Sequence, residues 1–508
     1  MTDTIPAATI PGVLRAAAET FADRVAYVED DQTLTFSDLL SRVRRTAAGY
    51  RDLGVSPGDR VVVWAPNSID WVVAALAVSY AGGALVPANS RYTGHEVADL
   101  VDRTSARLLV LADGFLGRSQ REEVSAASSL PSLIDTVDVH ELPDAEPGDI
   151  DEVASAVRPD DVADILFTSG TTGQPKGAMS AHRQTVGVAR AWGELGGVHA
   201  GDRYLVVNPF FHAFGYKVGI ITGLVTGATL YPLATFDVEQ VAALVESEQI
   251  TVLPGAPAIF SSILAAGVHT RHDLSSIRLA VTGAAVIPVV LIERMRAAAP
   301  DGLAIEQVVT AFGMTEAVVV TMCRGDESAE TVATSCGRAV PGMETRIDVP
   351  DGAPEGTAGE LLVRGENVML GYLDDPAATA EAIDADGWLH TGDVGTIDAD
   401  GNLRITDRLK DMYISGGFNV YPAEVEQVLA RLEGVYDVAV VGVPDDRLGE
   451  VGRAYVVGSV TEDAVLECAR ERLANYKVPR QVEIIEALPR NLAGKVLKNE
   501  LRPTSEES

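Results

Sequence analysis

Two patterns of hydrophobic and polar positions alternate along the chain: short apolar runs and segments with the spacing of a helix. Short apolar runs recur at intervals, as at Gly58–Trp64, where a turn enters a buried strand, and at Tyr204–Asn208. Segments with helical spacing of apolar residues lie between such runs, as at Val238–Ser247. Further strands are predicted at Arg107–Ala112, Ala228–Pro232, Thr251–Pro254 and Ile277–Thr282. Strands that alternate with helices indicate an α/β architecture with largely parallel sheets.

Two uncharged stretches, Trp71–Ser90 and Val218–Phe236, approach the length of a membrane span. Glycines interrupt both of them, and a proline also interrupts the first. Each is therefore predicted to be a buried helix that runs into a buried strand, with no membrane span. The acidic segment Asp138–Asp161 contains three prolines and is predicted to be a surface connection.

The pattern changes after Pro350. Short strands with turns are predicted at Gly359–Gly365 and Asn402–Asp407, and they lead into a C-terminal segment of mixed pattern. There, Val438–Val443 and Ala454–Val460 have the pattern of strands, and Glu462–Ala474 that of a helix. These segments predict a second, smaller α+β domain, with a boundary that the pattern alone places only within a few tens of residues.

The composition supports a folded core and restricts the partners. Of the 508 residues, 47% are hydrophobic and 22% are charged. Lys and Arg number 40 against 73 Asp and Glu, which gives a net charge of −33. Such a surface repels nucleic acid and anionic membranes, so neither is an expected partner. It also repels nucleotides, so any anion site has to be built locally from a few cations and backbone donors.

The cysteines and the N-terminal segment indicate the cellular compartment of the protein. Cys323, Cys336 and Cys468 have neither paired nor metal-ligand spacing, which argues against a disulfide framework or a zinc site. The first residues, Met1–Arg15, lack the basic start and apolar core of a secretory signal. Both observations predict a cytoplasmic protein.

One stretch carries the clearest chemistry. The apolar run Ile165–Phe167 predicts a buried strand, and it opens into Thr168–Gly177, with three glycines, four hydroxyl side chains and Lys176. Glycines let backbone N–H groups approach an anion, and the lysine adds a full charge. The spacing fits neither the P-loop nor the dinucleotide fingerprint. By composition alone, a loop over nucleotide phosphates and an ordinary surface loop are both open.

The loop resembles the phosphate-loop signature of the adenylate-forming superfamily, which includes acyl-CoA synthetases, luciferases and nonribosomal adenylation domains. The superfamily's other signature segments follow in the same order, so the resemblance covers nearly the whole chain. They are Phe312–Glu316, Trp388–Asp393, Asp407–Asp411 and Pro489–Lys495. The resemblance implies an N-terminal ATP- and acyl-binding domain at residues 1–407 and a mobile C-terminal domain at 408–508, with a hinge near Lys410.

The resemblance also implies the ATP site. Glu316 is its Mg²⁺ ligand, Thr315 lies against the phosphate, and Phe312 replaces the usual tyrosine, keeping ring stacking but losing a hydroxyl. The segment that carries them follows a predicted buried strand, Glu306–Val309. Asp393 and Arg408 hold the ribose hydroxyls, and a structural role is favoured for His390. The other implied nucleotide contacts are Thr168, Ser169, Gly170, Thr171, Thr172, Lys176, Gly283, Ala284, Ala285, Gly313, Met314 and Ile405.

The C-terminal domain is expected to act in both half-reactions. Lys495 reaches the reacting carboxylate and the α-phosphate during adenylation, and it matches a lysine that is reversibly acetylated in this family. Gly416 and Gly417 line the channel for the pantetheine arm of CoA, where a side chain would block passage. Lys477, Arg480 and Arg91 are the candidates for binding the CoA nucleotide phosphates.

The segment Pro209–Gly215 is expected to gate the acyl pocket. His212 matches the gating position of acyl- and aryl-CoA ligases, although a lone histidine among aromatics is more often a core residue. Phe211 and Phe214 are expected to contact the acyl group, with Ala284 and Met314 as further candidates. The runs Asn208–Lys217, Ile405–Val425 and Thr331–Arg338 resemble actinobacterial ligases of cholesterol degradation, which act on the propanoate of the bicyclic remnant of steroid rings C and D.

These observations predict an ATP-dependent acyl-CoA ligase that uses ATP, Mg²⁺ and CoA and releases AMP and pyrophosphate. The predicted acid is a bicyclic, steroid-derived propanoate of the hexahydroindane type. A medium-chain fatty-acid ligase and a ligase that loads a carrier protein are the alternatives, and a luciferase-like oxygenase is less favoured. A non-catalytic nucleotide sensor is disfavoured because it could dispense with Lys495. A homodimer is a family expectation only.

Overall fold

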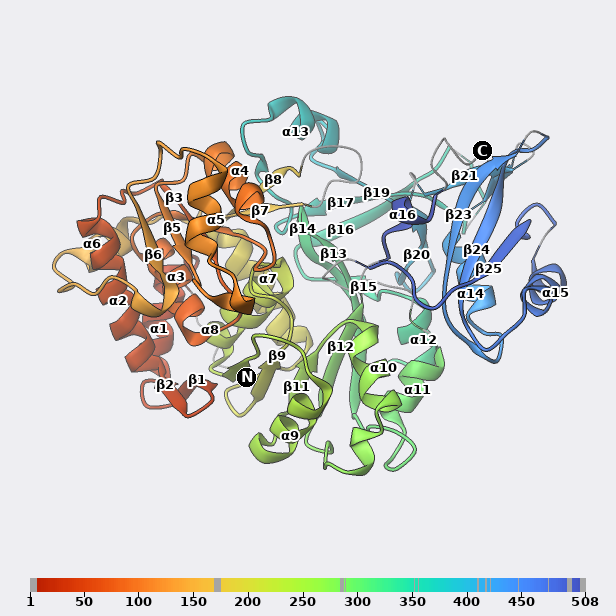
Figure 1. The fold of residues 1–508 in the computed structure, drawn as a ribbon, viewed down its shortest axis with the longest axis horizontal. Helices are drawn as coiled ribbons and strands as arrows, with labels where there is room; N and C mark the ends of the chain where they lie inside the picture. The colour runs from red at the N-terminus through yellow and green to blue at the C-terminus, as the bar shows by residue number, and fades with distance from the viewer. Residues whose placement is uncertain are drawn as a thin grey trace.

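The computed structural model describes residues 7–168, 175–283, 287, 289–350, 352–354, 356–408, 411–415, 418–420, 422–445, 447–473, 475–490 and 496–502. Two large sheets and the helices packed on them form the N-terminal part of the chain, and the C-terminal part forms a separate small sheet (Figure 1). This arrangement confirms the predicted fold class, a large α/β domain with a small C-terminal domain.

The larger sheet has nine strands in the order β15-β14-β13-β12-β11-β9-β10-β1-β2. All neighbours from β1 through β10, β9, β11 and β12 to β13 are parallel, and β2, β14 and β15 complete the edges in antiparallel pairing. The strands are β1 Val25–Glu29, β2 Gln32–Thr35, β9 Arg203–Val206, β10 Thr229–Pro232, β11 Val252–Pro254, β12 Leu279–Gly283, β13 Gln307–Met314, β14 Ala317–Met322 and β15 Arg338–Ala339. The strands predicted in this region are confirmed.

The second sheet has seven strands in the order β18-β8-β7-β4-β3-β5-β6. Its strands β7, β4, β3, β5 and β6 are parallel, whereas β8 and β18 are antiparallel additions at one edge. The strands are β3 Arg60–Trp64, β4 Ala84–Pro87, β5 Leu108–Leu111, β6 Asp135–Asp138, β7 Val162–Phe167, β8 Gly177–Ala181 and β18 Gly371–Tyr372. The phosphate-loop signature therefore connects β7 to β8 at this edge.

Helices join the two sheets through one core and cover their outer faces. The main core combines side chains from both sheets with those of α1, α2, α3 and α7, and a second core lies between the seven-stranded sheet and α4. The helices are α1 Ile10–Thr20, α2 Phe36–Asp52, α3 Ile69–Tyr80, α4 Gly94–Thr104, α5 Gln120–Ala127, α6 Ile150–Ala156, α7 His182–Leu195, a π-helix (η3) Phe214–Ile221, α8 Thr222–Thr226, α9 Val238–Glu248, α10 Pro257–Ala265, α11 Val289–Arg296 and α12 Ala329–Thr334, with 3₁₀ turns η1 Phe115–Gly117, η2 Val139–Glu141 and η4 Val268–Thr270.

Helix α3 explains the first long apolar stretch. Apart from Asp70 all of its residues are buried, so it is apolar around its whole circumference, as expected of a helix surrounded by protein. The side chain of Ser68 caps it by accepting a hydrogen bond from the Trp71 N–H at 3.0 Å. Within the described residues, no helix combines the length and the apolar composition needed to cross a membrane.

The rest of the chain forms two smaller sheets. The first has the order β16-β17-β19-β20 and the second the order β22-β21-β24-β23, with β25 paired to β24. The elements are β16 Met343–Asp348, β17 Gly359–Gly365, α13 Pro376–Ala382, β19 Leu389–Ile397, β20 Leu403–Arg408, β21 Tyr413–Ser415, β22 Phe418–Val420, α14 Pro422–Leu429, β23 Val435–Asp445, β24 Gly449–Gly458, α15 Glu462–Arg472, β25 Gln481–Ile484 and α16 Lys498–Leu501. The chain changes sheet between β20 and β21, and the boundary at residue 407 stays a prediction because Lys410 lies outside the described residues.

Two expectations differ from the structure. The segment Asp138–Asp161 is not only a surface connection, because it contains α6, which buries Ile150 and Ala154 against the main core. Two apolar side chains spaced four residues apart are enough for one buried helical face, although acidic neighbours mask the pattern. The strand predicted at Glu306–Val309 is β13, Gln307–Met314, so Phe312 and Gly313 lie within this strand and do not follow it.

Candidate active site

The phosphate loop is held at both ends. The N–H of Thr168, directly after β7, donates to the carbonyl oxygen of Lys176 at 2.9 Å, and this bond closes the base of the loop. Arg103 of α4 donates to the carbonyl oxygen of Pro175 at 2.6 Å, and its guanidinium lies 4.9 Å from the ring centroid of Phe167. The predicted phosphate contacts Ser169, Gly170, Thr171 and Thr172 lie outside the described residues.

Tyr372 connects two of the predicted phosphate-site residues. Its hydroxyl donates to Glu316 Oε1 at 2.9 Å, and the ammonium nitrogen of Lys176 lies 5.0 Å from its ring centroid. Tyr372 reaches this position because β18 pairs with β8, where Tyr372 lies opposite Ala178, two residues after Lys176. Burial and the charge of Glu316 raise the pKa of Tyr372, so its hydroxyl stays protonated and remains a donor at neutral pH.

Tyr372 could not be found from the sequence. It stands beside a glycine in a short segment, 56 residues from Glu316, and no charge or spacing distinguishes it from other tyrosines. Arg103 was missed for the same reason, because a basic residue in the last turn of a helix is common. Only the pairing of β18 with β8 and the packing of α4 bring these side chains to the loop.

Glu316 has the surroundings of a metal ligand. It occupies the turn between β13 and β14, where its carbonyl oxygen accepts from the Met369 N–H at 2.7 Å. The residue is only 7% exposed, and no cationic side chain among the described residues lies within ion-pair distance of its carboxylate. A buried carboxylate without a cation is costly. A bound Mg²⁺ fits this position.

The rest of the coordination has to come from elsewhere. In the part of the chain that the structure describes, no group of three or more His, Cys, Asp or Glu side chains could hold a metal ion. Magnesium in nucleotide enzymes is commonly bound by one or two carboxylates together with substrate phosphates. The single carboxylate of Glu316 therefore suits an ion that arrives with ATP. Thr315, predicted to lie against the phosphate, is half-buried in the same turn.

Two parallel strands end beside this turn. Gly283 closes β12 and pairs with Ala311 of β13, which continues through Phe312 and Met314, both packed against the main core. A Cβ on Gly283 would lie 3.0 Å from the Ala311 carbonyl oxygen, and one on Gly313 would lie 2.5 Å from the Val319 nitrogen. Glycine is required at Gly313 because the backbones approach so closely. Ala284 and Ala285 lie outside the described residues.

The ribose residues of the predicted motif face each other. Asp393 of β19 pairs directly with Arg408 of β20, and Ile405 lies opposite Gly395 in the same ladder. Asp393 is 3% exposed, and its N–H donates to Thr391 Oγ1 at 3.1 Å. The register of β19 and β20 thus brings together two residues that the family resemblance links. The side chain of Arg408 is not among those described.

His390, by contrast, is held in the scaffold. Its Nδ1 lies 2.9 Å from Glu360 Oε2, and the other oxygen of Glu360 accepts from the Gly392 N–H at 3.0 Å. Glu360 belongs to the neighbouring strand β17. This pairing holds β19 against β17 just before Asp393, where the register of the two strands shifts, and it agrees with the structural role favoured for His390.

The predicted acyl gate, Pro209–Gly215, forms the turn that enters the π-helix η3. The His212 N–H donates to the Pro209 carbonyl at 3.0 Å, and His212 Nδ1 accepts from the Phe214 N–H at 3.2 Å. The neutral ring therefore carries its proton on Nε2. His212 keeps an exposed edge, but desolvation by the protein around the ring lowers its pKa, so the imidazole is neutral at pH 7.

The aromatic residues of the gate differ in their packing. Phe214 packs edge-on against Trp192 of α7, with ring centroids 5.0 Å apart, and Phe211 is half-buried. Phe210 is fully buried and packs on Trp71 with ring centroids 5.2 Å apart. Phe211 and Phe214 are thus both partly exposed on either side of His212, whereas Phe210 belongs to the core. The sequence does not separate these three rings.

The three candidate cations for the CoA nucleotide have different surroundings. Both oxygens of Glu424 accept from Lys477, at 2.6 and 2.7 Å, so its charge is already matched. Arg480 is exposed and donates to Asn475, whose carbonyl oxygen lies 3.4 Å away. Arg91 is exposed in the loop after β4. The structure makes Lys477 the weakest of the three candidates for a phosphate.

The residues of the C-terminal domain that are predicted to act in the two half-reactions are not among those described. Lys495, Lys410, Gly416 and Gly417 lie outside the described residues. The ends of the segment that contains Lys495 are anchored, because Arg490 and Val496 form an antiparallel bridge and Lys498 pairs with Glu426 at 2.7 Å.

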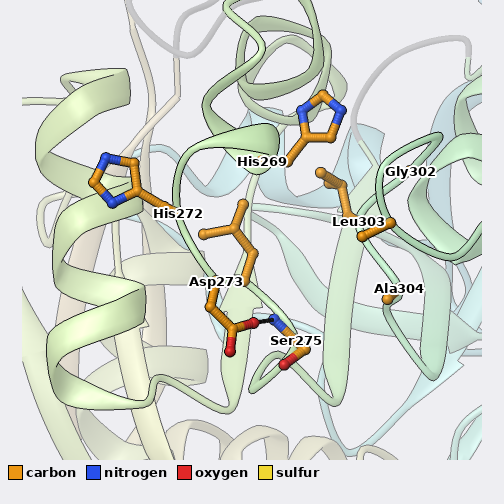
Figure 2. Close-up of a pocket in the computed structure, with 9 residues that line it drawn as sticks. His269, His272, Asp273, Ser275, Gly302, Leu303 and Ala304 are labelled. Carbon is orange, nitrogen blue, oxygen red and sulfur yellow. Dashed lines mark hydrogen bonds between the residues drawn. The ribbon is translucent and has the colours of Figure 1, made fainter.

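A cavity of about 140 Å³ lies elsewhere in the large domain. Figure 2 shows its lining, with His269, His272 and Asp273 on one segment and Gly302, Leu303 and Ala304 on another. These segments precede β12 and β13, whereas Gly283 and Phe312 lie toward the carboxyl ends of the same strands. Ligands of open α/β sheets bind at the carboxyl ends of strands. The cavity therefore lies at the amino ends of these strands, opposite to the end where the ATP site is expected.

Family models match both parts of the chain. The model described as AMP-binding enzyme matches residues 14–373, and that described as AMP-binding enzyme C-terminal domain matches residues 424–495. The chain belongs to the AMP-binding enzyme family. The crystal structure of ATP-bound MatB from Rhodopseudomonas palustris superposes with a TM-score of 0.86 at 28% identity, over 97% of this chain and 98% of that one.

Two relatives carry the same enzyme name, 3-[(3aS,4S,7aS)-7a-methyl-1,5-dioxo-octahydro-1H-inden-4-yl]propanoyl:CoA ligase. The protein from Rhodococcus jostii (strain RHA1) is 54% identical, over 97% of this chain and 98% of its own length. The protein from Mycobacterium tuberculosis is 51% identical, over 97% of this chain and 98% of its own length. The chain is an AMP-forming acyl-CoA synthetase, a class that uses ATP and Mg²⁺ with CoA as co-substrate.

Proposed function

We propose that this acyl-CoA synthetase forms the CoA thioester of a bicyclic, steroid-derived propanoate of the hexahydroindane type. The observation that carries the proposal is the 54% identity, over nearly the full length of both chains, with a ligase named for a methyl-dioxo-octahydroindenyl propanoyl group. The second relative with that name, at 51% identity, supports the same substrate class. The residue runs that resemble ligases of cholesterol degradation point the same way.

The first half-reaction joins two anions. A carboxylate oxygen of the acid forms a bond to the α-phosphorus of ATP, and the bond from that phosphorus to the leaving pyrophosphate oxygen breaks. Lys176 and the N–H groups of the loop would bind the phosphates, and Glu316 would hold Mg²⁺, which neutralises phosphate charge when bound. Tyr372 orients the Glu316 carboxylate by donating to one of its oxygens. Lys495 would supply positive charge at the reacting carboxylate.

The second half-reaction transfers the acyl group to CoA. The thiol sulfur forms a bond to the acyl carbon, the bond from that carbon to the phosphate oxygen breaks, and AMP leaves. We assign this step to the C-terminal domain, residues 408–508, after it turns about Lys410 relative to residues 1–407. Gly416 and Gly417 would then line the pantetheine channel in place of Lys495. One small domain would thereby serve two reactions that need different groups at the same centre.

The acyl pocket is expected to begin at the gate. The exposed edge of His212 and the half-buried Phe211 stand at its entrance, and a neutral imidazole suits an apolar ring system. A bulky bicycle needs a wide, short pocket with few polar anchors. Met314, at the end of β13, is a candidate for the wall on the ATP side.

The test of the proposed function is AMP release by the purified enzyme with ATP, Mg²⁺ and the bicyclic propanoate, with and without CoA. We expect release to require CoA and the thioester to be found by mass spectrometry at one equivalent per AMP. Adenylate formation without consumption of CoA would instead favour transfer to a carrier protein. Turnover of medium-chain fatty acids but not of the bicyclic acid would leave a general acyl-CoA ligase.

A cytoplasmic location, predicted from the cysteines and the N-terminal segment, and a homodimer, which is a family expectation, both belong to this proposal. Three free cysteines, two of them buried, suit a reducing compartment. Sedimentation of the purified enzyme would distinguish a dimer from a monomer.

A further inference from the structure

A buried ion pair lies between the predicted acyl gate and the phosphate loop. Lys217, in η3, places its ammonium nitrogen 3.0 Å from Asp164 Oδ1 and donates to Ser180 Oγ at 2.7 Å. The other oxygen of Asp164 accepts from Thr185 Oγ1 at 2.6 Å. The side chains of Lys217 and Asp164 are 2% and 0% exposed. We call Lys217, Asp164, Ser180 and Thr185 the buried clamp.

The clamp is attached to both ends of the phosphate loop. Asp164 and Ser180 are directly paired in the β7–β8 ladder. Asp164 precedes Thr168 by four residues, and Ser180 follows Lys176 by four residues. Thr168 directly follows β7, Lys176 directly precedes β8, and the Thr168 N–H donates to the Lys176 carbonyl oxygen, so the hairpin connects the clamp to both ends of the loop. A shift of the clamp would therefore move both ends of the loop together.

The same clamp is attached to the gate. Lys217 follows Phe214 by three residues and His212 by five, which is about one turn of a helix with i→i+5 hydrogen bonds. This helix is a π-helix, a form that is rare and often found at functional sites. The entry turn is tightly packed, because a Cβ on Gly215 would lie 2.2 Å from the Pro209 carbonyl oxygen. Displacing Lys217 would thus displace the gate.

A buried ion pair such as the one in the clamp is weak evidence for a stabilising role. Buried ion pairs can be replaced by neutral groups of similar size with little loss, because desolvation offsets their attraction. His182 does not share the charge of Asp164, since burial lowers its pKa to about 4, against the opposing effect of Asp164 and Asp161, and it is neutral at pH 7. Lys217 is the one cation within ion-pair distance of Asp164 among the described residues. Both side chains are buried with their charged atoms 3.0 Å apart, and such a contact suits the alignment of the two segments that carry them.

We propose that Lys217 and Asp164 are positioning residues that fix the acyl gate against the phosphate loop and so align the acid with the α-phosphate of ATP. The pair does not touch the reacting atoms and acts through the two segments attached to it. The inference rests on the proposed ligase function, because only an enzyme that joins an acid to ATP needs this alignment. Misplacement of reacting groups by about 1 Å can cost about a hundredfold in rate.

The test is the double variant Asp164→Asn with Lys217→Met, which removes both charges and leaves neither buried alone. We expect kcat for acyl-adenylate formation to fall by about tenfold to a hundredfold, with KM for ATP and for the acid changed less than about twofold. Transfer of a pre-formed, synthetic acyl adenylate to CoA should stay within about twofold of the wild type. In that substrate the acid and the phosphate are already joined, so no alignment is needed.

A second ion pair, in which the carboxylate is buried and the arginine is partly exposed, provides a control. Arg278 donates to Asp202 at 2.8 Å, and Asp202 is 1% exposed, at the start of β9 rather than beside the gate or the loop. The double variant Asp202→Asn with Arg278→Met should change stability without separating the two half-reactions. Ser180→Ala is a milder second variant of the clamp, since it removes one contact of Lys217 and leaves the ion pair intact. It should slow adenylation alone by several-fold.

The outcomes are distinct. Adenylation that is unchanged in both clamp variants overturns the proposal, and so does an equal loss in the two half-reactions, which indicates a purely structural role. The measurements use whichever acid the wild-type enzyme adenylates best. Failure of the bicyclic substrate would therefore be visible in the wild type and would not be confused with failure of the clamp.

Discussion

Exchanging Glu316 for glutamine is expected to lower kcat/KM for acyl-adenylate formation about a hundredfold, which is roughly 2.7 kcal/mol of transition-state stabilisation. Glutamine keeps the volume and an oxygen that can accept from Tyr372, but it carries no charge for a divalent ion. Without ligands the Tm should be unchanged or higher, because the variant loses a buried carboxylate that has no described cationic partner. The increase in Tm on adding ATP with Mg²⁺ should largely disappear.

Two companion variants make this result specific. Tyr372→Phe keeps the ring beside Lys176 and removes only the hydroxyl that orients Glu316, so a smaller loss of about three- to tenfold is expected. Glu344→Gln neutralises an exposed carboxylate that pairs with Arg364 and should have no effect on adenylation. Pyrophosphate exchange measured against Mg²⁺ concentration checks all three. An unaltered Mg²⁺ dependence in the Glu316 variant would contradict its assignment as the metal ligand.

Lys495→Met is expected to separate the two half-reactions. Adenylation should fall by about a hundredfold to a thousandfold, because the charge that Lys495 brings to the reacting anions is lost. Conversion of a synthetic acyl adenylate to the CoA thioester should stay within about twofold of the wild type, since the C-terminal domain would present Gly416 and Gly417 in that step. Rapid-quench measurement of each half-reaction provides the comparison.

The matched control for Lys495 is Arg472→Met, which removes one exposed positive charge in the last turn of α15 of the same domain. It should leave both half-reactions unchanged. Equal losses of adenylation and thioester formation in the Lys495 variant would argue against the exchange of roles within the C-terminal domain.

The fold was largely predictable because its strands are short apolar runs between turns. The segments that form β3, β9, β10, β11 and β12 are each visible as such runs, and most of α3 lies in the uncharged stretch that begins at Trp71. Strand register also supported one detail of the site. Asp393 and Arg408, which lie in two separate signature segments and are linked in the sequence only by the family resemblance, pair directly across β19 and β20.

The contacts that complete the site were not predictable, because they depend on pairing between distant segments. Tyr372 reaches Glu316 and Lys176 only through the two-residue strand β18 added to β8. Lys217 is flanked on both sides by uncharged residues, and nothing in the sequence connects it to Asp164, 53 residues earlier. The π-helical form of η3 was also hidden, since its apolar residues are buried on every side and give no clear period.

The most direct test of the proposed substrate is a comparison of kcat/KM between the bicyclic propanoate and straight-chain fatty acids of graded length, with ATP, Mg²⁺ and CoA at saturation. We predict a preference of about a hundredfold for the bicyclic acid, equivalent to roughly 2.7 kcal/mol of discrimination in the transition state. Equal or higher kcat/KM for a straight-chain acid would contradict the steroid-derived substrate and leave a general fatty-acyl-CoA ligase.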